Sequence, residues 1–116
     1  MRIARIYDPP RPGDGVRVLV DRLWPRGVRK EDPRIDRWIK QVAPSSDLRR
    51  WYSHDLEKYD EFVARYEHEL QDPVAAQALG ELRDVVRAGP VTLLTSARDF
   101  EHGHLPVLKR LLEAPR

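Results

Sequence analysis

Apolar positions along the chain follow two patterns: short, nearly continuous runs and a spacing of three to four residues. This alternation is typical of an α/β domain. Three short segments, residues 2–7, 16–20 and 91–95, have the β-branched and apolar character of strands. The second and third are apolar almost throughout, which indicates strands buried on both faces, as in a parallel sheet.

The helical spacing predicts several helices. One covers residues 33–42, because Ile35, Trp38, Ile39 and Val42 fall on one helical face. The other predicted helices begin, in chain order, at Ser45 or Ser46, after Asp55, at Pro73 and at Leu105. Ser and Asp favour the position before a helix and Pro favours its first turn, which supports these starts.

The order of strand, strand, helices, strand and helix predicts an α/β fold in a single small domain over residues 1–116. Its sheet is short and mostly parallel, with about three to four strands flanked by helices. A helical crossover from residues 16–20 to residues 91–95 makes these two strands parallel. Both then end at the same edge of the sheet, so the residues that follow them are expected to lie together.

Polar residues follow both strands, which predicts a ligand crevice at their carboxyl ends. The candidate catalytic residues are Asp21, Asp99, His54 and His102. The candidate ligand-binding residues are Arg22, Trp24, Arg26, Ser96, Arg98, Trp51 and Glu69. Arginines hold anions through paired hydrogen bonds, whereas an acid or an imidazole can orient them or move a proton.

The acids and arginines also have a purely structural interpretation. Asp21 and Arg22 can pair with Arg98 and Asp99 only to satisfy buried loop groups. Glu69 lies close to the apolar side of its predicted helix. There it is either a partner of Arg22 or Arg98, or an acid whose pKa is raised by partial burial.

The tryptophans have the same two interpretations. Trp24 is either part of the crevice or a side chain of the core. Arg49 and Arg50 next to Trp51 can stack a base or bind phosphate. We expect instead that the two arginines face solvent and that Trp51 is core, with the role of His54 open.

Other chemistry is weakly supported. A metal site is an alternative use of His102 and His104, which lie three and five residues after Asp99. No second pair of ligands accompanies them, so no bound metal is expected. Ser96 lacks the flanking glycines of a nucleophile elbow. No glycine-rich phosphate loop is present. The sequence identifies no cofactor.

Composition narrows the range of partners. No apolar run approaches the ~18 residues of a membrane span, and no apolar leader begins the chain, so a cytoplasmic protein without membrane contact is expected. Cysteine is absent, which excludes disulfides and thiolate chemistry. The net charge of +2, from 21 basic and 19 acidic residues, is small for strong nucleic-acid binding. The oligomeric state is open.

Four motifs cover much of the chain: RVLVDRLWPRG, APSSDLRRWYSHD, FVARYEHEL and VTLLTSARDFEH. Together they resemble the YeaO-like family of uncharacterised bacterial proteins, domain-of-unknown-function family 488. The resemblance implies a small cytoplasmic α/β protein and supplies no reaction. The motif positions are Asp21, Arg22, Trp24, Pro25, Arg26, Gly27, Ala43, Pro44, Ser45, Leu48, Trp51, His54, Asp55, Phe62, Tyr66, Glu69, Leu70, Thr92, Leu93, Leu94, Asp99 and His102.

The chain departs from the family pattern at two places. Tyr59 stands where the family commonly has Trp, which is a mild change. Residues 102–105 read HGHL where the family usually has HN-x-A. Loss of that Asn amide removes any role that depends on it and weakens a metal site built on His104.

The leading functional hypothesis is a protein that binds or acts on a small anionic ligand in the crevice. In this hypothesis the ligand bears phosphate, and a nucleotide is one such ligand. The alternatives are a nucleic-acid-associated accessory domain and a protein-interaction domain without catalysis. Whether the protein is an enzyme is open at this point.

Overall fold

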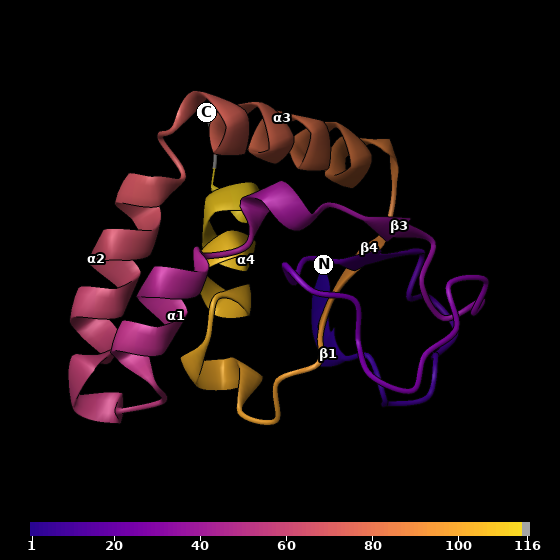
Figure 1. The fold of residues 1–116 in the computed structure, drawn as a ribbon. Helices are drawn as coiled ribbons and strands as arrows, with labels where there is room; N and C mark the ends of the chain where they lie inside the picture. The colour runs from indigo at the N-terminus through magenta and orange to yellow at the C-terminus, as the bar shows by residue number, and fades with distance from the viewer. Residues whose placement is uncertain (115–116) are drawn as a thin grey trace.

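The computed structural model describes residues 1–114, which form a four-stranded sheet and the helices around it (Figure 1). The strands are β1 (Arg2–Arg5), β2 (Val16–Leu19), β3 (Arg37–Trp38) and β4 (Val91–Thr95), in the order β1-β4-β2-β3. Each neighbouring pair is parallel. The predicted α/β class and the parallel sheet are confirmed.

Most of the helices lie between β3 and β4 along the chain, and two follow β4. They are η1 (Lys40–Val42), α1 (Ser46–Tyr52), η2 (Leu56–Lys58), α2 (Tyr59–Glu69), α3 (Pro73–Ala88), η3 (Phe100–His102) and α4 (Leu105–Glu113), where η marks a 3-10 turn. Figure 1 shows α1 and α2 next to each other, with α3 across the top of the molecule. No helix within residues 1–114 is long and apolar enough to cross a membrane.

Helices and loops cover opposite faces of the sheet. Side chains alternate between the two faces along a strand. Val18 and Leu93 join the large core built with the helices, whereas Leu19 and Leu94 join a smaller core closed by loop residues such as Val28. The central strands are therefore buried on both faces, as their apolar runs predict.

The prediction of a helix over residues 33–42 is wrong. The N–H of Asp36 donates to the carbonyl of Arg17 at 2.8 Å, and the N–H of Ile39 donates to that of Leu19 at 3.0 Å. The segment therefore pairs with β2 as the edge strand β3, and only its last three residues turn, as η1. Pairing with a neighbouring strand overrides a local helical pattern here.

Three of the other four predicted helix starts, those at Ser46, Pro73 and Leu105, are confirmed, and the start predicted after Asp55 is shifted. Ser45 caps α1, because its hydroxyl accepts from the N–H of Leu48 at 3.1 Å. Asp55 caps η2 instead of α2, because its carboxylate accepts from the N–H of Glu57 at 3.2 Å. Helix α2 then begins at Tyr59.

The carboxyl ends of β2 and β4 meet at one edge of the sheet, as predicted. Val16 lies opposite Val91 and Leu19 lies opposite Leu94. The residues that follow the two strands are therefore neighbours, although they are far apart in sequence.

A buried ion pair closes the opposite end of β2. The guanidinium of Arg17 contacts the carboxylate of Asp14, and both side chains are buried. Arg17 also donates from Nε to the carbonyl of Arg34 at 2.7 Å. Arg2 reaches the same carboxylate at 2.6 Å. This end of the strand is thus held by two guanidiniums that share one carboxylate.

Candidate functional site

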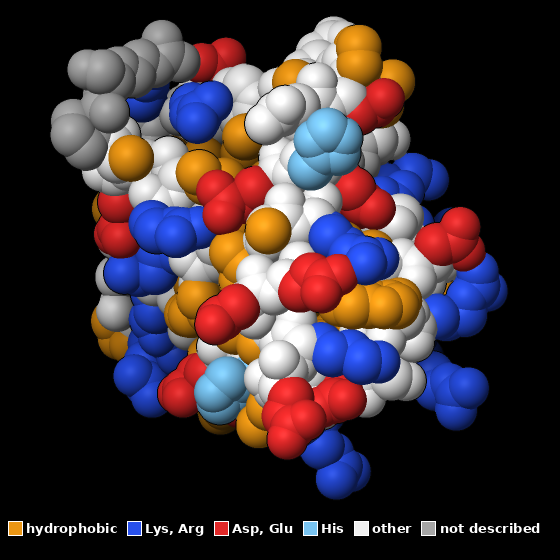
Figure 2. Space-filling view, turned by 90° about the vertical axis from the view of Figure 1, so that its left-hand side faces the viewer, with side chains coloured by type: hydrophobic (Ala, Val, Ile, Leu, Met, Phe, Trp, Pro, Cys, Tyr) orange, Lys and Arg blue, Asp and Glu red, His pale blue; other side chains and the backbone are white. Residues whose placement is uncertain are grey.

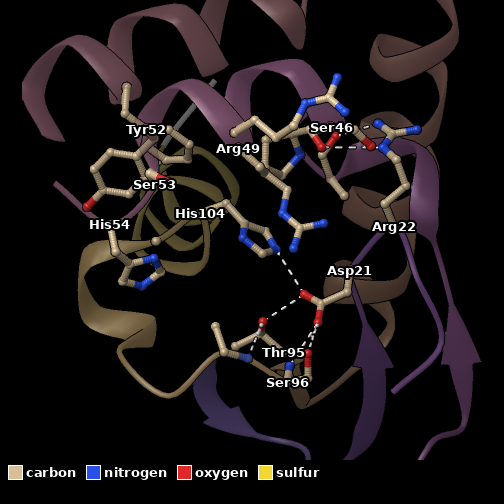
Figure 3. A pocket seen from close by; sticks show the side chains of 16 residues that line it. Asp21, Arg22, Ser46, Arg49, Tyr52, Ser53, His54, Thr95, Ser96 and His104 are labelled. Carbon is tan, nitrogen blue, oxygen red and sulfur yellow. Dashed lines mark hydrogen bonds and ion pairs between the residues drawn. The ribbon is translucent and has the colours of Figure 1, made fainter. Parts of the chain in front are cut away.

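A pocket of about 440 Å³ opens at the carboxyl edge of the sheet, between the ends of β2 and β4 and helix α1 (Figure 3). A second hollow of about 290 Å³ adjoins it and shares Asp21, Arg49 and Ser96 with it. Together the two form a crevice at the place where ligands bind in open α/β sheets. The polar residues that line the larger pocket include Asp21, Arg22, Ser46, Arg49, His54, Ser96 and His104.

Asp21 is the centre of a closed hydrogen-bond network. Its carboxylate accepts from the Thr95 hydroxyl at 2.7 Å, and from the Ser96 N–H at 2.8 Å and hydroxyl at 3.0 Å. Nε2 of His104 lies 3.3 Å away. Burial raises the pKa of this carboxyl, but His104, Ser96 and Thr95 together outweigh that effect and lower it below its ordinary value. Asp21 therefore stays ionised and is a weak base.

The side chain of His104 is fixed by two acceptors. Its Nε2 lies 2.9 Å from the carbonyl oxygen of Val20, besides its contact with Asp21. Because neither acceptor can donate, Nε2 carries a hydrogen, and in the neutral ring Nδ1 is an acceptor. Figure 3 shows the ring between His54 and Asp21. A hydrogen-bonding ring nitrogen is thus available where His104 lines the pocket.

Three arginines line the pocket in three different states. Arg22 donates from Nη2 to the carbonyl of Ala43 at 2.7 Å and from Nε to that of Pro44 at 3.3 Å, so it fixes the segment before α1. Arg50 is paired with Asp47 on the surface. Arg49 is exposed and makes no side-chain hydrogen bond or ion pair within residues 1–114. It is the guanidinium that remains available to a ligand.

The other end of the pocket is aromatic. Tyr52 and Phe62 are buried there, and the exposed ring of His54 stacks on Tyr52. Ser53 and His54 have φ values of 47° and 55°, in the left-handed region that non-glycine residues rarely adopt. The pocket therefore has one basic end and one flat, aromatic end.

Asp99, His102 and Arg98, predicted as site residues, lie beyond the lining of this pocket. Nδ1 of His102 is 2.8 Å from the carboxylate of Asp99, and both side chains are partly exposed on η3. Arg98 is exposed, and its side chain makes no hydrogen bond or ion pair within the described residues. Of the polar residues that follow β4, the structure brings Ser96 and His104 to Asp21.

Trp51 and Glu69 lie on the far side of α1. Trp51 packs between Lys58 and Arg65, whose cationic atoms lie 5.2 Å and 4.0 Å from its ring centroids. Glu69 accepts from the N–H of Ser45 at 2.8 Å and from its hydroxyl at 2.5 Å. The Glu69 carboxylate thus fastens the start of α1 to the end of α2 rather than pairing with an arginine.

Trp24 and Arg26 line the adjoining hollow instead of the main pocket. Nε1 of Trp24 donates to the carbonyl of Val28 at 2.7 Å, which closes the loop after β2. The ring of Trp24 meets that of Trp38 edge to face at 5.3 Å. Arg26 is exposed, and its carbonyl accepts from the Tyr7 hydroxyl at 2.9 Å. These contacts stiffen the loop that carries Asp21.

The structure adds His104 and Arg49 to the predicted set. His104 belongs to the polar residues expected after residues 91–95 but is not among the candidate site residues, and Arg49 is exposed, as expected, yet lines the pocket. Arg49 lies three residues after Ser46 on α1, so the two share one helical face, and both line the pocket.

A metal site is not assembled by the residues that the structure describes. Within residues 1–114 no three side chains of His, Asp or Glu are grouped so that they could hold a metal ion. His102 and His104 have different partners, Asp99 for the first and Asp21 with Val20 for the second.

Comparison with known proteins gives a family. A family model described as the inactive DUF488-N3 subclade matches residues 1–115. The chain belongs to this family. It is 48% identical over 112 residues to the uncharacterised protein Rv3073c of Mycobacterium tuberculosis, covering 97% of this chain and 92% of the relative. It is 40% identical over 108 residues to the uncharacterised protein YeaO of Escherichia coli, covering 93% and 92%. No solved structure matches the chain.

The family assignment confirms the resemblance to YeaO-like proteins. The names of these relatives state no ligand and no reaction. The chemistry of the pocket therefore has to be argued from its own residues.

Proposed function

We propose that the protein binds a small anionic, phosphate-bearing molecule in the pocket at the carboxyl edge of the sheet. The observation that carries this proposal is the imbalance of charge in the lining. It contains three arginines and one carboxylate, that of Asp21, whose oxygens already accept hydrogen bonds from Thr95 and Ser96. Arg49, without a partner within residues 1–114, supplies the planar fork that matches a phosphate.

Binding without conversion is the form of this proposal that the residues support best. Asp21 is engaged by its donors and has a lowered pKa, which makes it a poor proton acceptor. The pair of Asp99 and His102 lies outside the pocket lining. The description of the matching family as an inactive subclade agrees with a binding role.

The test compares two arginine variants with the same loss of charge. Calorimetric titration of the wild type with inorganic phosphate and with sugar phosphates should show binding. Arg49→Gln should weaken the affinity by about 10- to 100-fold, because it removes a charge-assisted hydrogen bond. Arg98→Gln, at an exposed position outside the pocket, should leave the affinity unchanged. Equal weakening by both variants would indicate nonspecific attraction and would sink the proposal.

The nucleic-acid alternative finds little support on the face built by α1 and α2. Figure 2 shows acidic and basic side chains mixed over this face rather than gathered by sign. A basic stripe is the usual footprint of a protein that follows a phosphate backbone. Steep salt dependence of binding to single- or double-stranded DNA would reverse this ranking. A cytoplasmic location is part of the proposal, and cell fractionation tests it.

A further inference from the structure

The aromatic end of the pocket is the outer layer of a longer stack. The rings of His54 and Tyr52 are 5.6 Å apart at 28°, and those of Tyr52 and Phe62 are 4.5 Å apart at 27°. Tyr66 continues the stack behind Phe62 at 6.0 Å and 23°. The inner rings are buried, whereas His54 is exposed. The stack therefore ends at the pocket in one uncovered ring.

The backbone at His54 is fixed by hydrogen bonds of its two neighbours, and its ring is fixed by stacking on Tyr52. The N–H of Ser53 donates to the carbonyl of Arg49 at 2.9 Å, and the N–H of Asp55 donates to that of Tyr52 at 2.9 Å. The imidazole itself makes no hydrogen bond within residues 1–114. Its φ of 55° is one that glycine adopts without strain. A strained residue that keeps a ring in a pocket suggests a task for that ring.

We propose that the ligand carries a flat heteroaromatic ring that stacks on His54 while its phosphate is held by Arg49. This is the chemistry of a nucleotide, and the inference rests on the proposed function. The two groups come from the same short segment, because Arg49 is on α1 and His54 follows the end of that helix. One ligand that spans the pocket can reach both. Figure 3 shows His54 and the Asp21 network at opposite sides of the opening.

The size of the pocket favours a mononucleotide over a polymer. Its volume of about 440 Å³ lies within the ~300–1,000 Å³ of sites that enclose one small molecule. A nucleic acid would also need a charged track beyond the pocket, and the face in Figure 2 has mixed charges. We therefore commit to a free mononucleotide as the occupant.

The test measures the ratio of two affinities, for adenosine monophosphate and for ribose 5-phosphate, which differ in the base alone. In the wild type the nucleotide should bind about 5- to 100-fold more tightly, as expected for one stacked base. His54→Gly removes the ring at a φ that suits glycine and should bring the ratio close to one. His54→Phe restores a flat ring and should keep the ratio. His68→Ala, at an exposed position outside the pocket, should keep it too.

The outcomes separate the two proposals. If ribose 5-phosphate binds in an Arg49-dependent way but the nucleotide binds no better, or if His54→Gly leaves the ratio unchanged, the stacking inference alone is overturned. If neither compound binds the wild type, or Arg49→Gln affects neither, the proposed function itself fails. Tighter and strongly salt-dependent binding of a 5′-phosphorylated single-stranded oligonucleotide would overturn the mononucleotide as the occupant.

Discussion

A buried aspartate lies at each end of β2, but the two carboxylates have different partners. Asp14 precedes the strand and Asp21 follows it; both are buried, and the pKa of each is lowered. At the amino end the carboxylate faces the guanidiniums of Arg2 and Arg17. At the carboxyl end it faces hydroxyls, a main-chain N–H and His104.

This difference decides whether a guanidinium remains free to bind a ligand. At the amino end the carboxylate of Asp14 engages the guanidiniums of both Arg2 and Arg17. At the carboxyl end the acid is satisfied without using an arginine, so Arg49 remains available. A cluster of acids and arginines therefore indicates a binding site only where a guanidinium is left without a protein partner.

The largest expected effect is on the amino end. Asp14→Ala leaves Arg17 buried without its carboxylate and should lower the free energy of unfolding by about 3–5 kcal/mol in urea titrations. Asp84→Ala removes an exposed acid from α3 and should change it by less than about 0.5 kcal/mol. Similar values for the two variants would show that the buried pair at the start of β2 contributes little.

The next effect is on the carboxyl end. Asp21→Asn keeps the shape of the side chain but turns an amide N–H₂ toward groups that donate, from Thr95, Ser96 or His104. A buried donor left without an acceptor costs about 1–3 kcal/mol, so the variant should be destabilised by that amount. Ligand affinity should fall as well, because Ser96 and His104 line the pocket. An Asn variant as stable as the wild type would remove the structural role assigned to Asp21.

The sequence is sufficient to predict strands β1, β2 and β4, but not the edge strand β3. Residues 16–20 and 91–95 are apolar enough to require burial on both faces, so their parallel pairing follows. Residues 33–42 carry helical spacing, yet main-chain pairing with β2 decides their structure. That pairing depends on a partner 19 positions earlier in the chain, which no local pattern contains.

The location of the candidate site was predictable from the sequence, but the residues that line it were less so. Crossover topology brings Asp21 and Ser96 together, and polar residues at strand ends mark the edge. Asp99 and His102 follow the same strand but turn away in η3, where they pair with each other. His104 comes back toward Asp21 only through the start of α4. How a loop folds back is set by packing and not by distance along the chain.

Lowering the pH should remove the stabilisation that Asp14 contributes at the amino end of β2. The main-chain N–H of Arg11, then the guanidiniums of Arg2 and Arg17, lower the pKa of Asp14 to about 2 against the opposing effect of burial. Because this pKa is lower in the folded chain than in the unfolded one, the stabilisation is present above the ordinary value. It is lost as the pH falls from about 5 toward 2.

Comparing the wild type with Asp14→Ala isolates this contribution from those of the other carboxyls. The difference in unfolding free energy between the two proteins should be largest near neutral pH and should narrow steadily toward pH ~2. A difference that stays constant over this range would mean that Asp14 titrates alike in the folded and unfolded chains.

The smallest expected change in stability is that of Arg49→Gln, and it separates the two ends of β2 most clearly. Arg49→Gln should alter the free energy of unfolding by less than about 0.5 kcal/mol in the absence of ligand, because the guanidinium has no partner to lose within the described residues. In saturating ligand the wild type should gain about 2.7 kcal/mol at 100 times its Kd, and the variant clearly less. Arg17→Met should behave the opposite way, destabilised without ligand and unimpaired in binding where it still folds. Should Arg49→Gln prove as destabilising as Arg17→Met, Arg49 would belong with the structural arginines, and the pocket would have lost its free cation.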